Sequence, residues 1–360
     1  MIKSSNVIRV LIVDDSPFMR KVLRDIFESD PEIRVVGVAK DGREALDIAE
    51  SVKPDVITLD IEMPVMNGLE CLSRLLEQGT YAVIMISAVT TAGAKATIEA
   101  LNIGAVDFIA KPGNIFQISA EEKREELIQK VKIAKEAGLI NLSKKADIKK
   151  KQFIGTKAQK IEKIIAIGTS TGGPRALQRV IPFLPGDLPA AVVIVQHMPQ
   201  GFTRSLASRL NDISEMTVKE AEDKEIMKAG YVYIAPGDRH LLLSKHGNDI
   251  ILQLDDSSPV SGHRPSFDKT LFSMIKLEQD NIIGVIMTGM GMDGSKGLKG
   301  LKEKAGIRII AQDEQSCIVY GMPRTAIEMG IVDKVVPLEQ IPVSILNYMG
   351  VRDNGHEPVS

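Results

Sequence analysis

The sequence contains no tryptophan, and aromatic residues make up only 4% of its 360 residues. We therefore expect a core of aliphatic side chains, mainly isoleucine, valine, leucine, alanine and methionine. No apolar run approaches the roughly 20 residues that a membrane-spanning helix requires, so we expect no membrane insertion. No basic and then apolar leader opens the chain, and we expect a cytoplasmic protein.

The sequence also contains few cysteines and has a small net charge. Cys71 and Cys317 are the two cysteines, and they lie far apart with no spacing typical of metal ligands. We expect both to be buried as small apolar residues in a reducing compartment. A net charge of −2 does not favour nucleic acid as a partner. The length of 360 residues favours two cores rather than one.

What the sequence does contain, between residues 7 and 138, is a fivefold alternation of apolar runs and amphipathic stretches. The apolar runs are predicted strands at residues 7–13, 34–38, 56–59, 82–86 and 106–109. Helical stretches such as Pro17 to Glu28 and Gly42 to Ser51 separate them. This pattern predicts an α/β fold, a doubly wound parallel sheet with helices on both faces. In such sheets, ligands bind outside the carboxyl ends of the strands.

Polar residues stand where these predicted strands end. They are Asp14 and Asp15 after the first strand, Asp60 after the third, Ser87 after the fourth and Lys111 after the fifth. Three carboxylates at one sheet edge repel one another unless a cation neutralises them, and hard oxygen ligands suit Mg²⁺. Asp60 can then accept a phosphoryl group as an aspartyl-phosphate. Each residue alone is more often a helix cap or a loop residue, but five at matching strand ends argue against coincidence.

Four segments of this half resemble the response regulator receiver domain. They are Val-Asp-Asp-Ser at 13–16, Asp-Ile-Glu-Met-Pro at 60–64, Asn-Gly at 67–68 and Ala-Lys-Pro at 110–112. The resemblance implies a flavodoxin-like receiver that is phosphorylated on Asp60. It also implies that Mg²⁺ is held by Asp14, Asp15, Asp60 and the backbone carbonyl of Glu62. Ser87 would be the switch hydroxyl, and Lys111 the lysine that pairs with the phosphoryl oxygens.

A lysine-rich stretch follows a charged helical stretch at residues 121–137. Residues 141–160 have no apolar periodicity, and neither flanking half carries a matching basic character. We therefore interpret the stretch as a solvated polar linker rather than a nucleic-acid arm. The predicted organisation is a receiver at 1–138, a linker at 139–160, a second α/β parallel-sheet domain at 161–350 and a polar tail at 351–360.

The second half opens with a short strand and a glycine-rich turn. After the apolar residues 163–167, Gly-Thr-Ser-Thr-Gly at 168–172 fits the G-x-S-x-G nucleophile elbow, which would expose the hydroxyl of Ser170. The same loop also suits a phosphate or dinucleotide, and the loop alone leaves the two readings near even. No Gly-Lys-Ser/Thr follows, which excludes a P-loop. Asp187, near the position of a ribose-binding acid, lies in an apparent turn.

His197 and Asp293 favour the nucleophile. His197 ends the predicted strand at 190–195, and a parallel neighbour would bring it to the same sheet edge as Ser170. Asp293 follows a third strand, at 281–287, in a glycine-rich turn. Alone, the histidine is more often a structural hydrogen-bonder and the aspartate a cap for the next helix, at 295–304. The order Ser, His, Asp differs from that of α/β-hydrolases, but such triads occur in several orders on unrelated folds.

This half resembles the CheB family of chemotaxis protein-glutamate methylesterases. The matching segments are Ile-Gly-Thr-Ser-Thr-Gly-Gly at 167–173, Gln-His-Met-Pro at 196–199, Gly-Phe-Thr at 201–203, His-Arg-Pro-Ser at 263–266 and Thr-Gly-Met-Gly-Met-Asp-Gly at 288–294. Thr169 stands where the family often carries alanine. The resemblance implies a Ser170–His197–Asp293 mechanism with backbone N–H groups of Thr171 and Met290 receiving the oxyanion.

The resemblance also implies substrates and partners. Methylated chemoreceptors would be the substrate, possible glutamine deamidation would use the same machinery, and the histidine kinase CheA would donate the phosphoryl group. We expect a monomer that needs no cofactor for ester hydrolysis. Two rival classes are a receiver-controlled DNA-binding regulator and a second domain that binds a partner without catalysis. The first would need a basic helix-turn-helix half, which the alternating strands and helices do not suggest.

Overall fold

The computed structural model describes residues 7–79, 81–111, 121–138, 160–277 and 281–350. The chain divides into two compact units, Met1–Lys145 and Ala146–Ser360. All but one residue of the predicted linker, and the predicted tail, lie outside the described residues. Within the described ranges, no helix combines the length and apolar composition needed to cross a membrane. Cys71 and Cys317 are both buried free thiols, as expected.

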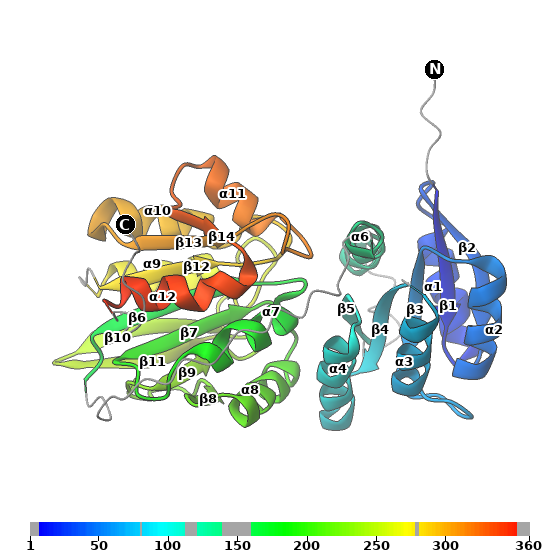
Figure 1. Cartoon of the computed structure of the whole chain (residues 1–360), viewed down its shortest axis with the longest axis horizontal. Coiled ribbons are helices and arrows are strands. Elements are labelled where there is room, and N and C mark those ends of the chain that lie inside the picture. The colour runs from blue at the N-terminus through cyan, green and yellow to red at the C-terminus, as the bar shows by residue number, and fades with distance from the viewer. Residues whose placement is uncertain (1–6, 80, 112–120, 139–159, 278–280, 351–360) are drawn as a thin grey trace, which may run out of the picture. The chain divides into compact units, whose positions relative to one another are not determined.

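The first unit is a five-stranded parallel sheet in the order β2-β1-β3-β4-β5 (Figure 1). Its elements are β1 (Ile8–Val13), α1 (Pro17–Phe27), β2 (Ile33–Ala39), α2 (Gly42–Val52), β3 (Val56–Asp60), α3 (Gly68–Gln78), β4 (Ala82–Ala88), α4 (Thr91–Ile103), β5 (Asp107–Lys111) and α6 (Glu121–Gly138). The predicted parallel α/β architecture is confirmed. Lys111 is the last residue of β5 rather than the residue after it, a shift that leaves it at the same sheet edge.

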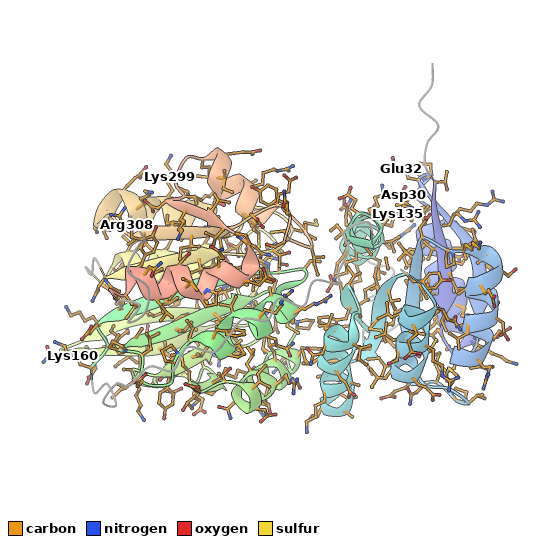
Figure 2. All side chains as sticks on the ribbon, in the orientation of Figure 1. Asp30, Glu32, Lys135, Lys160, Lys299 and Arg308 are labelled. Carbon is orange, nitrogen blue, oxygen red and sulfur yellow. The ribbon has the colours of Figure 1, made fainter. Side chains whose placement is uncertain are left out.

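Helix α6 is strongly charged and is held to its unit by two kinds of contact. Its buried residues Leu127, Val131 and Ala134 recur at helical spacing and form one apolar face. Its lysines form ion pairs with acidic residues in β5 and in the loops before β2 and β3. The pairs are Lys130 with Asp107 at 2.7 Å, Lys132 with Asp30 at 2.8 Å, and Lys135 with Asp55. Figure 2 labels Asp30 and Lys135 on this side of the unit. The helix therefore packs against its unit through a narrow apolar face, and its lysines form ion pairs around that face.

The second unit contains a seven-stranded parallel sheet in the order β14-β13-β12-β6-β7-β9-β8. Its strands are β6 (Lys163–Thr169), β7 (Ala190–Gln196), β8 (Thr217–Glu220), β9 (Tyr231–Ile234), β12 (Ile282–Ile286), β13 (Arg308–Gln312) and β14 (Lys334–Val336). Its helices are α7 (Gly173–Val180), α8 (Phe202–Ile213), α9 (Phe267–Ile275), α10 (Ser295–Ala305), α11 (Met322–Glu328) and α12 (Ile341–Tyr348), with 3-10 turns at Ile181–Phe183 and Leu338–Gln340. The predicted parallel sheet is confirmed here too. An antiparallel hairpin, β10 (His240–His246) with β11 (Asp249–Asp255), was not predicted.

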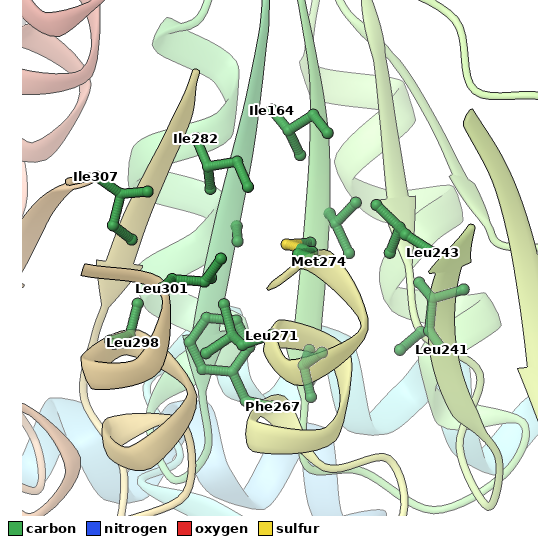
Figure 3. Close-up of a cluster of buried hydrophobic side chains, with 14 of the residues drawn as sticks. Ile164, Leu241, Leu243, Phe267, Leu271, Met274, Ile282, Leu298, Leu301 and Ile307 are labelled. Atoms are coloured by element: carbon green, nitrogen blue, oxygen red, sulfur yellow. The ribbon is translucent and has the colours of Figure 1, made fainter. Parts of the chain in front are cut away.

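Two helices pack closely against the centre of this sheet. One face of α9, formed by Phe267, Leu271 and Met274, lies in the core with Leu298 and Leu301 of α10 (Figure 3). A Cβ atom added at Gly168 on β6 would lie 2.0 Å from the Phe267 ring. Glycine is therefore needed at this position for α9 to approach the end of β6. As a result, the N-terminus of α9 lies beside the turn that follows β6.

Candidate functional site

The first unit gathers the predicted acidic residues at the carboxyl edge of its sheet. Asp14, Asp15 and Asp60 each offer a carboxylate oxygen, and these oxygens lie within 4.8 Å of one another. The Nζ atom of Lys111 lies 2.6 Å from Asp60 Oδ2 and 3.1 Å from Asp14 Oδ2. The lysine charge thus offsets part of the repulsion among the three acids.

The electrostatics of this cluster suit a divalent cation. Burial raises the pKa of Asp60 to about 6, against the opposing hydrogen bond and charge of Lys111. Burial acts to lower the pKa of Lys111, but the hydrogen bond and charge of Asp60 outweigh it and raise that pKa. Asp14 Oδ2 is buried, and its ion pair with Lys111 is the contact that offsets its charge. Such oxygens fit Mg²⁺, which prefers carboxylate ligands.

Two further predicted residues lie near the cluster but do not join it. The Ser87 hydroxyl is buried and donates to the carbonyl of Gly93 at 3.1 Å. It would have to rotate to reach a group on Asp60. The backbone N–H of Glu62 donates to Asp60 Oδ1 at 3.4 Å, so Glu62 lies beside Asp60. A cavity of about 580 Å³ lined by Asp15 and Glu62 opens there.

In the second unit, the strand register brings Ser170 and His197 to one sheet edge. Thr169 of β6 pairs with Gln196 of β7, and each predicted site residue directly follows its strand. The Ser170 N–H donates to the carbonyl of Thr288 at 3.0 Å, and the His197 N–H to that of Thr169 at 3.2 Å. Gly172, at φ 78°, makes the sharp turn into α7 that a side chain would strain.

Asp293 reaches this edge from the loop after β12. Its Oδ2 lies 2.8 Å from His197 Nε2. The same carboxylate accepts hydrogen bonds from the start of α9: Ser266 Oγ at 2.8 Å, Phe267 N–H at 2.6 Å and Asp268 N–H at 3.0 Å. Burial acts to raise the pKa of Asp293, but His197 and these N–H groups outweigh it and lower that pKa to about 2. Asp293 is therefore ionised at neutral pH.

The Asp293 contact decides which histidine nitrogen can act as a base. A carboxylate only accepts hydrogen bonds, so Nε2 of His197 carries the proton and Nδ1 carries the lone pair. Nδ1 is buried and has no hydrogen-bond partner. Within the described part of the chain, the Ser170 hydroxyl makes no hydrogen bond to it. Catalytic hydrogen bonds are often long in free enzymes and tighten when substrate binds.

The two predicted oxyanion donors belong to segments that lie beside Ser170. Thr171 follows Ser170 directly and is buried. Met290 follows Gly289, where an added Cβ atom would lie 2.8 Å from the Ser170 Cβ atom. The loop that carries Met290 therefore contacts the Ser170 turn. Met290 is 45% exposed, so it lies on the surface.

Several supporting residues were missed by the sequence reasoning. Gln196 Nε2 donates to the carbonyls of Ser170 at 2.9 Å and His197 at 3.2 Å, which ties the two loops together. The reading of Asp293 as a cap for the following helix is wrong. Asp293 caps α9, whereas Asp268 of α9 accepts from the Gly297 N–H of α10 at 2.7 Å. Ser266, three residues before Lys269, is a typical helix N-cap residue, so the sequence could have predicted the start of α9. It could not have predicted that Asp293 contacts this helix end.

Comparisons with known proteins agree with both units. A family model described as "CheB methylesterase" matches residues 165–345, and one described as "Response regulator receiver domain" matches residues 10–121. The "Protein-glutamate methylesterase/protein-glutamine glutaminase" of Geobacillus kaustophilus is 46% identical over 95% of this chain and 99% of its own. The protein of the same name from Thermotoga maritima is 47% identical over 96% of this chain and 100% of its own length. The crystal structure of the Thermotoga maritima CheB methylesterase catalytic domain covers 51% of this chain and 97% of its own, with 49% identity and a TM-score of 0.50.

Proposed function

Because the chain belongs to the CheB methylesterase family and carries a receiver domain before the esterase domain, we propose that it is a receiver-regulated protein-glutamate methylesterase. Its substrate is a γ-glutamyl methyl ester on the helical cytoplasmic region of a chemoreceptor, and it acts in the cytoplasm. The observation that carries this proposal is the buried His197–Asp293 pair at the sheet edge where Ser170 follows β6.

The proposed reaction uses these three residues in sequence. The Ser170 hydroxyl attacks the ester carbonyl and gives its proton to Nδ1 of His197, while Asp293 stabilises the imidazolium. The backbone N–H groups of Thr171 and Met290 receive the oxyanion. Methanol leaves with the proton from His197. Water then cleaves the acyl-enzyme by the same steps and restores glutamate and Ser170.

The receiver supplies the control. We propose that Asp60 accepts a phosphoryl group from the histidine kinase CheA. Asp14, Asp15, Asp60 and the Glu62 carbonyl would hold Mg²⁺, which shields the negative charge of the phosphoryl oxygens when bound. Lys111, already 2.6 Å from Asp60, pairs with the transferred group, and Ser87 rotates to donate to it.

The proposed machinery also suits an amide. A receptor glutamine would form the same acyl-enzyme, with ammonia leaving in place of methanol. His197 would protonate the leaving nitrogen as it protonates the methoxide. Ammonia release from an unmodified receptor, measured beside methanol release from a methylated one, checks this second activity.

Methanol release from a methylated receptor tests the main proposal. We expect Ser170→Ala to lose activity by on the order of 10⁴-fold or more, because it removes the nucleophile. Ser208→Ala, an exposed serine on α8, is the matched control and should retain wild-type activity. A Ser170→Ala variant with more than a few per cent of wild-type rate would remove Ser170 from this role. A wild-type protein that binds receptor without releasing methanol would favour a non-catalytic second domain.

A further inference from the structure

A second histidine lies flat against the proposed base. The rings of His197 and His263 stack with centroids 4.0 Å apart and planes only 7° from parallel. His263 is only partly buried, whereas the His197 side chain is 8% exposed. One face of the base is therefore covered by a ring from a different loop.

The loop that carries His263 is rigidly supported. Val260 and His263 exchange two backbone hydrogen bonds, at 3.0 and 2.9 Å, across a tight turn. The next residue, Arg264, donates to Asp238 Oδ1 at 2.6 Å, and the Asp238 N–H donates back to the Arg264 carbonyl at 3.1 Å. The backbone of His263 is thus held on both sides along the chain.

The stack supplies a restraint that Asp293 does not. One hydrogen bond at Nε2 holds a single point of the His197 ring and leaves rotation about that contact possible. Nδ1 has no partner to oppose this rotation. A parallel ring at van der Waals distance allows only one plane.

We propose that His263 is a positioning residue, whose ring holds the plane of His197 so that Nδ1 faces Ser170. This inference rests on the proposed function of Ser170 and His197. It requires the flat ring of His263 and not its nitrogen atoms, so a phenyl ring should replace it and a polar chain should not.

Three substitutions in the full-length chain separate these requirements. His263→Phe keeps a ring, His263→Gln keeps polar atoms without a ring, and His263→Ala keeps neither. We expect kcat for methanol release to fall about 10- to 100-fold in the Gln and Ala variants, with KM within about 2-fold of wild type, a loss of the size that misplaced catalytic groups cause. The Phe variant should stay within about 3-fold. His246→Ala, an exposed histidine at the end of β10, is the matched control.

The rate at which a fluorophosphonate labels Ser170 provides a second readout. It requires the activated hydroxyl but no receptor, so it should follow the same order of variants even if the receptor ester is not the substrate. If the wild-type protein is labelled but releases no methanol, the result would count against the proposed function and would not contradict the positioning role of His263. Equal labelling and kcat in His263→Ala and wild type would overturn the inference. Rescue by Gln rather than Phe would also overturn it, because a polar contact would then be the requirement.

Discussion

The Asp293 carboxylate illustrates how single residues determine the chemistry of this protein. It accepts from His197 Nε2, Ser266 Oγ and two backbone N–H groups, so both oxygens are held in fixed directions. Against the opposing effect of burial, these hydrogen bonds lower the pKa of Asp293 to about 2 and keep the carboxylate ionised. An ionised carboxylate accepts the hydrogen bond from His197, so the proton of His197 lies on Nε2. In the proposed reaction the base is therefore Nδ1, the nitrogen nearer the backbone.

His197 and Asp293 should behave as one catalytic unit. We expect His197→Gln and Asp293→Asn each to reduce methanol release severely, because either change removes the oriented base. The double variant should lose far less than the product of the two single losses, since residues that act on one proton are non-additive. A double-mutant cycle on kcat measures this. Losses that multiply would mean that the two side chains act independently.

Asp60 should be the phosphoryl acceptor of the receiver. With a small acyl-phosphate donor and Mg²⁺, intact-protein mass spectrometry should show one added phosphoryl group in wild type and none in Asp60→Asn. Because the Asp60 pKa is raised to about 6, the carboxyl gains a proton as pH falls below that value. We therefore expect Mg²⁺ to bind more weakly at pH 5 than at pH 7 by calorimetry. Labelling that persists in the Asn variant would move the acceptor elsewhere, most simply to Asp15.

At the scale of elements, hydrogen bonds in both directions connect the N-terminal ends of α9 and α10. Asp293, in the loop before α10, accepts from the first N–H groups of α9, and Asp268 of α9 accepts from Gly297 of α10. Each acid accepts hydrogen bonds from N–H groups at a helix N-terminus, which have no partner within their own helix. The pair of helices packs on β6 and β12 through Phe267 and Leu298 (Figure 3). Helix packing and the orientation of the catalytic acid therefore depend on the same contacts.

Asp268 should make stability depend on pH. Burial, with the nearby charge of Asp293, raises its pKa to about 6, above the value of about 3.9 in unfolded chains. The folded state then binds more protons between these values, so this residue's contribution to stability falls as pH rises from about 4 through 6. We expect the stability of wild type relative to Asp268→Asn to be higher at pH 5 than at pH 8.

Urea unfolding of the second unit at both pH values measures this difference. Asp249→Asn, an exposed acid at the start of β11, is the control and should show no such change. A difference between wild type and Asp268→Asn that is the same at pH 5 and pH 8 would contradict the assignment. It would mean that the carboxyl of Asp268 titrates alike in the folded and unfolded states.

At the scale of the whole molecule, a receiver and an esterase share one chain. Asp60 and Ser170 belong to different units. We therefore expect a phosphoryl group on Asp60 to act on the Ser170 site by changing how the units interact. Such a switch requires two populated arrangements whose balance phosphorylation shifts. We predict a resting arrangement in which the receiver blocks a bulky receptor helix from the Ser170 site.

A fragment beginning near Gly155 tests this arrangement. It should release methanol faster than the unphosphorylated full-length chain, because it lacks the block. Phosphorylation conditions should accelerate the full-length chain and leave the fragment unchanged. A fragment no faster than the resting chain would exclude inhibition by the receiver and indicate direct activation instead.

The sequence by itself determined the parallel α/β architecture of both units and the position of each polar residue along the chain. Buried strands need unbroken apolar runs, and strand ends need polar or small residues, so both leave a local pattern. Asp60 after Val56–Leu59 and Ser170 between glycines could therefore be selected without a structure. The β10–β11 hairpin, whose two seven-residue strands pair antiparallel, was not predicted.

The tertiary structure alone decided which atoms meet. Whether Asp293 would cap its own helix or α9 depends on how α9 and α10 pack, and no local pattern records that. The contact of Asp293 with Nε2 of His197, on which the proposal of Nδ1 as the base depends, and the stacking of His263 on His197 join segments far apart in sequence. A sequence pattern records the conformation of its own segment, whereas hydrogen-bond partners across a fold are determined by packing that involves the whole domain.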